Sequence, residues 1–313
     1  TPMQRREAAA RRALAGAGLI ECVHYSFVAE AEAAAFGGGG PEMALANPIA
    51  DHLSHMRPTP LPGLVTAARR NQARGFGEIG LFEIGPAFHG PEPGEQTTEA
   101  AALRTGYTAP RDWSGARRPV DALDAKADAV AALAAIGVDV AKLSVAREAP
   151  GWYHPGRSGV LKLGPKVTLA AFGELHPRTL SALDIKGPAV AAQVFLQAAP
   201  TPRAKGPGRP ALAVSDLQAV ERDFAFVVPA LCEAETALRA ARSADKTLIE
   251  SAAVFDVFEG PKAEQQFGAG HKSIAIAVRL QPTAATLTDA QIEAVGQRVV
   301  AAVTAATGGT LRG

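Results

Sequence analysis

The last hundred residues of the chain carry the pattern that most restricts its fold. In residues 221–228, large apolar side chains alternate with smaller or charged ones, which is the period of two of a half-buried strand. A helical run follows at 233–243, and two more strands are expected at 254–260 and 273–280. A Thr-x-x-Gln capping box at Thr288 begins a last helix, and a final strand closes the chain. This order predicts the split βαβ, ferredoxin-like plan.

In such a plan two helices cover one face of a four-stranded sheet and leave the other face free to bind a ligand. The alternation places Phe224 and Phe226 on the covered face, together with the isoleucines of residues 273–280. Small side chains between charged ones leave room on the open face for a flat base with hydrogen-bonding edges. A solvated sheet surface that binds nothing is the alternative. The open-face residues are Asp223, Ala225, Ala275, Ala277 and Arg279, with Arg222, Lys262, Lys272 and Arg312 expected at the rim as phosphate contacts.

A run dense in proline and glycine divides the chain. Residues 200–211 contain Pro-Thr-Pro-Arg-Ala-Lys-Gly-Pro-Gly-Arg-Pro, a composition typical of a semi-rigid exposed linker. The 313 residues are enough for two domains that each bury a core. We therefore expect one domain at 1–199, a linker at 200–211 and a second domain at 212–313.

The first domain is predicted to be rich in strands. Helices are expected at 1–18, 64–74 and 120–137, and a mobile loop at 91–99. Because strands outnumber crossover helices, the sheet should be largely antiparallel with helices packed on it, so the whole chain is expected to be α+β. Strands are expected at 19–28, 78–84, 100–107, 142–147, 158–163, 166–174 and 190–196, the fifth and sixth joined by a Gly164-Pro165 turn.

The second domain contains four notable motifs: Arg222-Asp223-Phe224-Ala225-Phe226-Val227-Val228, Phe255-Asp256-Val257-Phe258-Glu259-Gly260, His271-Lys272-Ser273-Ile274-Ala275 and Thr286-Leu287-Thr288-Asp289. Together they resemble the ferredoxin-fold anticodon-binding domain that ends the beta subunit of bacterial phenylalanine–tRNA ligase. Motifs of the first domain resemble the catalytic-like domain that precedes it in the same subunit. These are Asn47-Pro48-Ile49, Ser54-His55-Met56-Arg57, Leu61-Pro62-Gly63-Leu64, Arg70-Asn71, Leu81-Phe82-Glu83-Ile84-Gly85, His154-Pro155-Gly156-Arg157-Ser158 and Gly173-Glu174-Leu175-His176-Pro177.

The resemblance covers nearly the whole chain. It implies that this chain performs its function as one subunit of an enzyme with other subunits. It implies a class II synthetase-like fold in the first domain, which serves as a scaffold without activity, while the alpha subunit carries the chemistry. The expected partners are that alpha subunit and tRNA(Phe), within a cytoplasmic heterotetramer that uses ATP and Mg²⁺. No cofactor and no catalytic residue is expected in this chain itself.

A class II active site needs arginines for ATP phosphates and carboxylates for Mg²⁺. The candidates are Arg69, Arg70, Arg74 and Glu83, but the sequence lacks a glycine-rich strand-to-helix segment that ends in arginine, the third class II signature. The chain is therefore expected to activate no amino acid on its own. The residues expected to be structural or to lie at the contact with the alpha subunit are Met56, Arg57, Arg70, Asn71 and Glu83.

The sequence departs from the family pattern after Arg57. The family usually continues with Thr-Ser-Leu-Leu-Pro, whereas this chain has Pro58 and Pro60, which fix φ and remove two N–H donors. Any strand there should be an edge strand. The chain also begins at Thr1 rather than methionine, and we expect it to be a piece of a longer subunit. The resemblance implies that the editing module and the Mg²⁺ site of that subunit lie upstream, so neither is expected in this chain.

Charge and composition limit other functions. From Arg209 to the end, ten Lys and Arg stand against twelve Asp and Glu. Either RNA contact here is local and directed at bases, or the main phosphate contacts come from elsewhere. Cys22 and Cys232 lie far apart, which predicts no disulfide and fits a reducing cytoplasm. The sequence contains no run of about twenty apolar residues, so no membrane-spanning helix is expected. The histidines lack clustered partners, so no metal site is expected at His52, His55, His154 or His176.

Two other functions remain open for the same pattern. The βαββαβ plan also occurs in regulatory domains that bind free amino acids, so the chain could be an amino-acid sensor. An independent relative that activates an amino acid by itself is the third possibility, although the missing arginine signature is against it.

Overall fold

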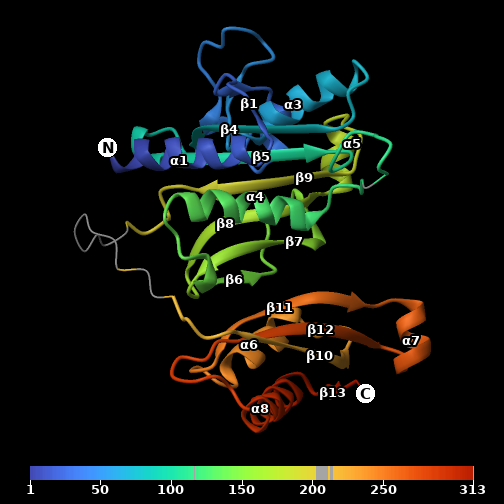
Figure 1. Cartoon of the computed structure of the whole chain (residues 1–313). Helices are drawn as coiled ribbons and strands as arrows, with labels where there is room; N and C mark the ends of the chain where they lie inside the picture. The colour runs from blue at the N-terminus through green and yellow to red at the C-terminus, as the bar shows by residue number, and fades with distance from the viewer. Residues whose placement is uncertain (116, 202–210, 212–213, 313) are drawn as a thin grey trace. The chain divides into compact units, whose positions relative to one another are not determined.

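The computed structural model describes residues 1–115, 117–201, 211 and 214–312. The chain forms two compact units, Thr1–Lys205 and Gly206–Gly313 (Figure 1). The predicted linker, residues 200–211, lies mostly outside the described residues.

The first unit contains a seven-stranded sheet in the order β1-β4-β5-β9-β8-β7-β6 (Figure 1). All neighbouring strands are antiparallel except β1 and β4, which are parallel. The predicted antiparallel-rich α+β class is therefore confirmed. The strands are β1 (Ile20–Glu21), β4 (Ile79–Phe88), β5 (Gln96–Thr105), β6 (Leu143–Ala146), β7 (Tyr153–Leu163), β8 (Val167–Leu175) and β9 (Ala189–Phe195).

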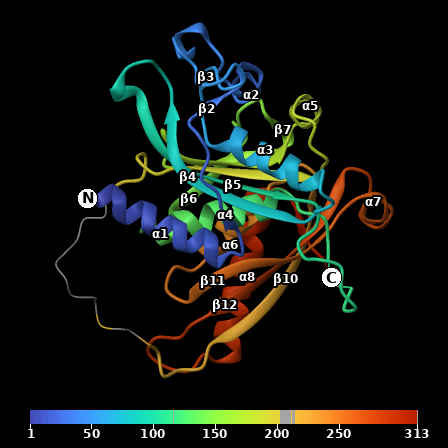
Figure 2. The same cartoon turned by 90° about the horizontal axis from the view of Figure 1, so that it is seen from above.

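Helices cover both faces of this sheet. Figure 2 shows α1 (Pro2–Gly16) and α4 (Ala122–Ala135) on one side and α3 (Leu61–Gln72) on the other. Each side has its own apolar core, one around Phe82 and Phe172 and the other around the α3 leucines. A small two-stranded sheet, three 3-10 turns and two short helices complete the unit: β2 (Phe27–Val28), β3 (His55–Met56), η1 (Pro41–Met43), η2 (Pro93–Glu95), η3 (Val140–Lys142), α2 (Glu30–Ala34) and α5 (Pro177–Ala182).

Local sequence signals explain where several elements begin and end. The Thr1 hydroxyl accepts a hydrogen bond from the Gln4 N–H and completes a capping box, which fixes the start of α1. Gly164 has a φ of +66° between β7 and β8, a conformation that glycine adopts without strain. The predicted hairpin at this position is confirmed.

Two expectations for this unit are wrong. The single strand expected at 19–28 is instead two short strands, because the side chain of His24 turns inward to Glu83 and interrupts the ladder. The loop expected at 91–99 contains η2, and β5 already begins at Gln96. There Thr98 is held by a hydrogen bond from its N–H to the Gln197 side chain, a long-range contact that local composition does not reveal.

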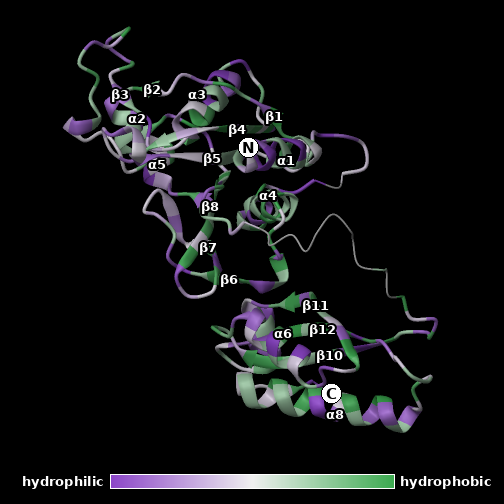
Figure 3. Ribbon diagram, turned by 90° about the vertical axis from the view of Figure 1, so that its left-hand side faces the viewer, coloured by the Kyte–Doolittle hydropathy of each residue, from purple (hydrophilic) through white to green (hydrophobic). Residues whose placement is uncertain are grey.

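The second unit is a four-stranded antiparallel sheet in the order β11-β12-β10-β13, which is the predicted ferredoxin-like arrangement. The long helices pack on one face, where Phe226, Ile274 and Ile276 are fully buried as predicted. In Figure 3 α8 mixes hydrophilic and hydrophobic residues along its length, as a helix with one covered side must. The elements are β10 (Val220–Pro229), α6 (Ala234–Ser243), β11 (Ile249–Phe258), α7 (Pro261–Phe267), β12 (His271–Leu280), α8 (Asp289–Thr307) and β13 (Thr310–Leu311).

None of the helices in the described part of the chain is both long enough and apolar enough to span a membrane.

Candidate functional site

The open face of the four-stranded sheet brings together six of the eight residues expected to bind RNA. Residues paired directly across antiparallel strands share a face, and Asp223 pairs with Ala277, Ala225 with Ala275, and Glu221 with Arg279. The Arg312 N–H donates to the carbonyl of Ala225 at 2.7 Å, which continues the register of β13 and adds Arg312 to this face. The six are Asp223, Ala225, Ala275, Ala277, Arg279 and Arg312.

Arg279 is held in place on this face by two carboxylates. Its Nε lies 2.7 Å from Oε2 of Glu250, and its Nη1 lies 3.1 Å from Oε1 of Glu221. The hydrogen bond to Glu250, followed by the one to Glu221, raises the pKa of Arg279. The guanidinium is thus oriented before any ligand arrives, with part of its donor fork still directed to solvent.

The middle of the face is nearly flat because it consists of alanines. Ala275 is 8% exposed, whereas Ala225 and Ala277 are half-buried between their neighbours. Methyl groups leave the strand backbone close to the surface, so a planar ring can lie against it between Asp223 and Arg279. The arrangement can bind a base through edge hydrogen bonds and van der Waals contact.

Arg222 and Lys272 do not join this face. Arg222 pairs with Val278 and Lys272 with Val228, and both valines belong to the core under the helices. Arg222 also donates from Nη1 to the carbonyl of Glu221 at 3.0 Å. Both basic side chains therefore leave the sheet on the helix-covered side.

A group of aromatic residues near the β11–β12 connection is not evident from the sequence. The rings of Phe258 and Phe267 meet edge to face at 6.0 Å, and the Arg312 guanidinium lies 5.1 Å from the centre of the Phe267 ring. Phe255 is 59% exposed at a register shift of β11. The bulge interrupts the alternation from which the faces of the sheet were assigned. The only sign of this aromatic group in the sequence is that Phe255 and Phe258 are three residues apart.

A second cluster of polar groups lies inside the first unit and includes two residues expected at the subunit contact. Arg57 Nη1 donates to Oε1 of Glu83 at 2.6 Å, and His24 Nδ1 lies 2.5 Å from Oε2 of the same carboxylate. Arg57 is 1% exposed and Glu83 is 3% exposed. Burial opposes ionisation of Glu83, but the hydrogen bond from His24 and the charge of Arg57 outweigh it and lower the pKa of this carboxyl.

Glu99 and Gln193 form a further buried polar pair on the same sheet face. Gln193 Nε2 lies 3.4 Å from Oε2 of Glu99, and its Oε1 accepts hydrogen bonds of 3.1 Å from both Trp152 and Tyr153. Burial raises the pKa of Glu99 to about 7, against the weaker lowering effect of its hydrogen bonds with Thr59 and Gln193. These side chains satisfy one another beneath the α3 layer.

The candidate nucleotide ligands do not form a site that fits ATP and Mg²⁺. Glu83 is committed to Arg57 and His24, and Arg69 donates to the carbonyl of Leu183 at 3.4 Å. Arg70 and Arg74 are exposed on or just beyond α3. Among the described residues no group of three or more His, Cys, Asp or Glu could hold a metal ion.

The residues expected at a subunit contact are divided between interior and surface. Arg57 and Glu83 are buried, so direct contact of these two side chains with another chain would require the site to open. Asn71 is half-buried and donates from Nδ2 to the carbonyl of Ala67 at 2.9 Å. Met56 is half-buried in β3 and Arg70 is exposed on α3.

An exposed apolar strip that the sequence did not reveal follows the β1 edge of the large sheet. Ile20, Val23 and Tyr25 are 68%, 89% and 69% exposed. Val23 and Tyr25 also border a hollow of about 720 Å³ that reaches His24 and Arg70. Contiguous exposed apolar side chains at a sheet edge are typical of a surface that another protein covers.

His154 and His176 come together, with ring centres 6.3 Å apart, but they serve the backbone. Each Nδ1 accepts a hydrogen bond from the main-chain N–H two residues later, at Gly156 and Arg178. This arrangement stabilises turns and supplies no metal ligands or acid–base pair.

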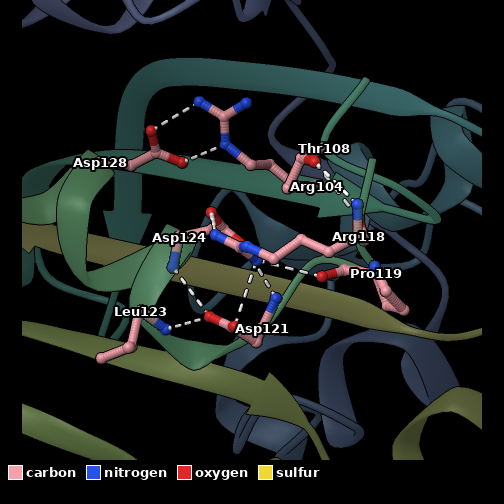
Figure 4. Close-up of polar contacts among 8 residues, drawn as sticks. All are labelled: Arg104, Thr108, Arg118, Pro119, Asp121, Leu123, Asp124 and Asp128. Atoms are coloured by element: carbon pink, nitrogen blue, oxygen red, sulfur yellow. Dashed lines mark hydrogen bonds and ion pairs between the residues drawn. The ribbon is translucent and has the colours of Figure 1, made fainter. Parts of the chain in front are cut away.

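Another polar cluster, shown in Figure 4, fixes α4 to its surroundings. Arg104 binds both carboxylate oxygens of Asp128 at 2.7 Å and also donates to the carbonyl of Ala17, which joins β5 to α4 and to the residue after α1. Arg118 binds Asp124 through two hydrogen bonds, at the first turn of α4 that Asp121 caps. This cluster is architectural.

Comparison with known proteins gives one matching family for each of the two units. Residues 1–196 match the family described as phenylalanyl tRNA synthetase beta chain CLM domain, and residues 215–312 match the ferredoxin-fold anticodon binding domain. Over its whole length the chain is 58% identical to the phenylalanine–tRNA ligase beta subunit of Cereibacter sphaeroides and 56% identical to that of Ruegeria pomeroyi. The chain spans 39% of the length of each of these relatives. A pyrrolysyl tRNA synthetase from Desulfitobacterium hafniense gives a TM-score of 0.47 at 18% identity, over 61% of this chain and 65% of that chain.

Proposed function

Because the chain belongs to the phenylalanyl tRNA synthetase beta chain CLM domain family, we propose that it is the tRNA-binding and subunit-pairing part of a phenylalanine–tRNA ligase. In this proposal the open face of the β10–β13 sheet binds the anticodon region of tRNA(Phe). The match of residues 215–312 to an anticodon binding domain supports it, as does the arrangement of Arg279 beside a floor of alanines. The second unit holds the RNA, and this orients the acceptor end for chemistry elsewhere.

The observation that carries this proposal is that Asp223, Arg279 and Arg312 converge on the one sheet face that α6 and α8 leave open. Hydrogen-bonding groups around a flat apolar floor suit single-stranded bases, and few phosphate contacts are needed. This is consistent with a domain that lacks an excess of basic residues.

Fluorescence anisotropy of labelled tRNA(Phe) with the full chain tests the RNA site. Arg279→Met and Arg312→Met should each weaken binding at least about fivefold, because each removes a donor group aimed at bases. Arg239→Met, at an exposed position of α6, is the matched control and should leave binding unchanged. Equal affinities for all four proteins would refute the assignment of the open face.

We propose that the first unit pairs with the catalytic alpha subunit through the strip of Ile20, Val23 and Tyr25. The strip is apolar, exposed and next to the buried Arg57–Glu83 pair, which holds the adjoining backbone in place. The contacts expected at Met56 on β3 and at Arg70 and Asn71 on α3 stay a prediction.

Co-expression with a candidate alpha subunit, followed by size exclusion, tests this pairing. Val23→Asp and Tyr25→Asp should abolish co-elution, since a buried unpaired carboxylate is costly at an interface. Phe76→Asp, which changes an apolar residue of similar exposure elsewhere in the unit, should co-elute like the unchanged chain. Loss of co-elution for Phe76→Asp alone would place the contact elsewhere.

In the same proposal this chain catalyses no step of aminoacylation itself. ATP and Mg²⁺ are bound by the alpha subunit, and the complex is cytoplasmic. The supporting observation is that Glu83, Glu99 and Gln193 are each more than nine-tenths buried and satisfied by neighbouring side chains. The two cysteines are both free, which agrees with a reducing compartment. ATP–pyrophosphate exchange by the purified chain should equal the background rate, and exchange above it would contradict the proposal.

The relatives favour this function over an amino-acid sensor. Calorimetric titration with free amino acids should therefore give no binding heat at concentrations where tRNA(Phe) binds. Tight amino-acid binding without any tRNA binding would favour the sensor instead.

A further inference from the structure

The second unit carries a groove on the side opposite to the proposed RNA face. It has a volume of about 900 Å³ and runs along α8 beside β10. Phe224, Ile292, Gly296, Val300 and Leu311 line its apolar part. The groove lies on the helix-covered side of β10, because Phe224 pairs with the buried Ile276.

The groove borders a strand edge that is only partly paired. β10 pairs with β12 along its whole length, but β13 pairs with it only at Phe226 and Val227, and the next residue, Arg312, bonds to Ala225. No strand lies beside residues 220–224 on this edge in the part of the chain that the structure describes. An open edge next to an apolar groove is the arrangement by which sheets bind an extended peptide as an added strand.

The direction of the backbone shows which groups an added strand would meet. Ala225 directs its carbonyl to β13, so Asp223 and Glu221, two and four residues earlier, direct their main-chain groups to the same edge. The carbonyl of Glu221 currently accepts a hydrogen bond from the Arg222 side chain. An entering strand can replace that bond, since the side chain is exposed and free to move.

A second copy of this chain is a poor occupant. In an antiparallel pair of two β10 edges, a two-fold axis at Arg222 sets the two arginines opposite each other and Glu221 opposite Asp223. An axis at Glu221 or at Asp223 places identical carboxylates opposite each other. Like charges directly opposed across strands destabilise pairing, so this edge resists self-association.

The charges around the groove indicate the chemistry of the occupant. Glu221 and Asp223 flank the edge on one face, and Asp289 and Glu293 lie at the Arg222 end of the groove on the other. Glu221 is paired with Arg279 on the open face, so Asp223, Asp289 and Glu293 stand against Arg222. This excess of carboxylates repels the phosphates of a nucleic acid and attracts a basic peptide.

We propose that this groove and edge bind an extended peptide segment of another protein, in which apolar residues alternate with lysine or arginine. The peptide pairs with residues 220–224 as a continuation of β13. Its apolar side chains enter the groove beside Phe224 and Gly296, and its basic side chains lie opposite Glu221 and Asp223. This partner is additional to the tRNA and the alpha subunit, and it shares Asp223 with the proposed RNA face.

The test uses the full chain and a short acetylated peptide of alternating valine and lysine, with a valine–glutamate peptide of equal length as the matched probe. Anisotropy should show binding of the lysine peptide at least about tenfold tighter than of the glutamate peptide. Hydrogen exchange should show new protection at the amides of Glu221 and Asp223. Failure of the lysine peptide to bind, or binding without this protection, overturns the proposal.

Two variants separate the groove from general attraction to an acidic surface. Gly296→Phe fills the groove next to Phe224 and should weaken binding of the lysine peptide at least about tenfold. Ala306→Phe, at an exposed position of the same helix, should leave the affinity for this peptide unchanged. Asp223→Lys should reverse the preference toward the glutamate peptide. If Gly296→Phe folds but retains full peptide affinity, the groove is not the site.

Two results would assign the groove to another occupant and also overturn the proposal. One is weakened tRNA binding in Gly296→Phe together with displacement of the peptide by tRNA, which would make the groove part of an RNA site. The other is a concentration-dependent dimer of the unchanged chain that Gly296→Phe dissociates.

Discussion

Arg57 and Glu83 form an ion pair of 2.6 Å inside the first unit, with 1% and 3% of their surfaces exposed. The pair is anchored further by Arg57 Nε, which donates to the carbonyl of Pro86 at 3.0 Å. It thereby connects the segment that enters α3 to the strand β4. In a protein that we propose has no chemistry of its own, this pair has a structural role.

Removing one partner of this pair should be costly, and removing both should cost less. Arg57→Met and Glu83→Gln each leave an uncompensated buried polar or charged group, with an expected loss of about 3–5 kcal/mol for Arg57→Met. The double variant should recover part of that loss. Chemical denaturation monitored by tryptophan fluorescence measures the free energy of unfolding of each variant, since both tryptophans lie in this unit. Strict additivity of the two losses would contradict the coupling.

The stability of the first unit should fall as the pH rises through neutrality because of Glu99. Its pKa is raised from an ordinary value of 4.5 to about 7 by burial. The unfolded chain therefore releases this proton at lower pH than the folded chain does. The stabilisation is complete below pH 4.5 and is lost as the pH rises to about 7, by about 3 kcal/mol at roughly 1.4 kcal/mol per pH unit.

Glu99→Gln tests this titration, because an amide stays neutral at every pH. Relative to the unchanged chain, the variant should gain stability between pH 5 and pH 8, with the size given above. The control, Glu259→Gln at an exposed position, should show no such gain. A stability difference for Glu99→Gln that does not vary with pH would contradict the raised pKa.

The Arg104–Asp128 pair should matter far more than the neighbouring Arg118 contacts. Asp128 is 3% exposed, so Arg104→Met leaves a buried carboxylate unpaired and should destabilise the unit by about 3–5 kcal/mol. The Arg118 side chain is 53% exposed, and Arg118→Met should cost at most about 1 kcal/mol. Thermal unfolding of both variants compares the two, and equal losses would show that burial does not decide the effect.

Two glycines of the second unit should respond in opposite directions to alanine. Gly308 ends α8 with a φ of +69°, so Gly308→Ala should destabilise this helix end by about 1 kcal/mol. Gly296 lies inside α8, where a methyl group meets Phe224 at an ordinary 3.6 Å, so Gly296→Ala should stabilise the helix by up to about 1 kcal/mol. Hydrogen exchange of α8 measures both changes.

Much of the fold follows from local patterns. The alternation in β10 and β12 correctly assigns Phe226, Ile274 and Ile276 to the core and Asp223 and Ala277 to the opposite face. Prediction failed where a long-range contact overrides the local pattern. His24 turns toward Glu83, fifty-nine positions away, and divides the strand expected at 19–28.

The candidate sites were predicted less completely than the fold. Alternation predicts which residues share the open face. Charge alone does not predict the face on which a side chain lies, and Arg222 and Lys272 lie on the other side of the sheet. The bulge of β11 and the Arg312–Phe267 contact depend on how the strands pack against one another and against α7. The alternation of apolar and polar residues does not predict that packing.

By itself the sequence determined the order of most of the longer strands and helices, the division into two halves and the family, because backbone periodicity and ordered motifs are local properties of the chain. Only the tertiary structure decided that Glu83 and Glu99 are buried and paired, that β13 covers just part of the β10 edge, and that a groove lies beside it. Those features depend on strand register and on contacts such as Gln193 with Thr59, which are 134 positions apart. Folding sets such contacts through packing, which no short stretch of sequence specifies.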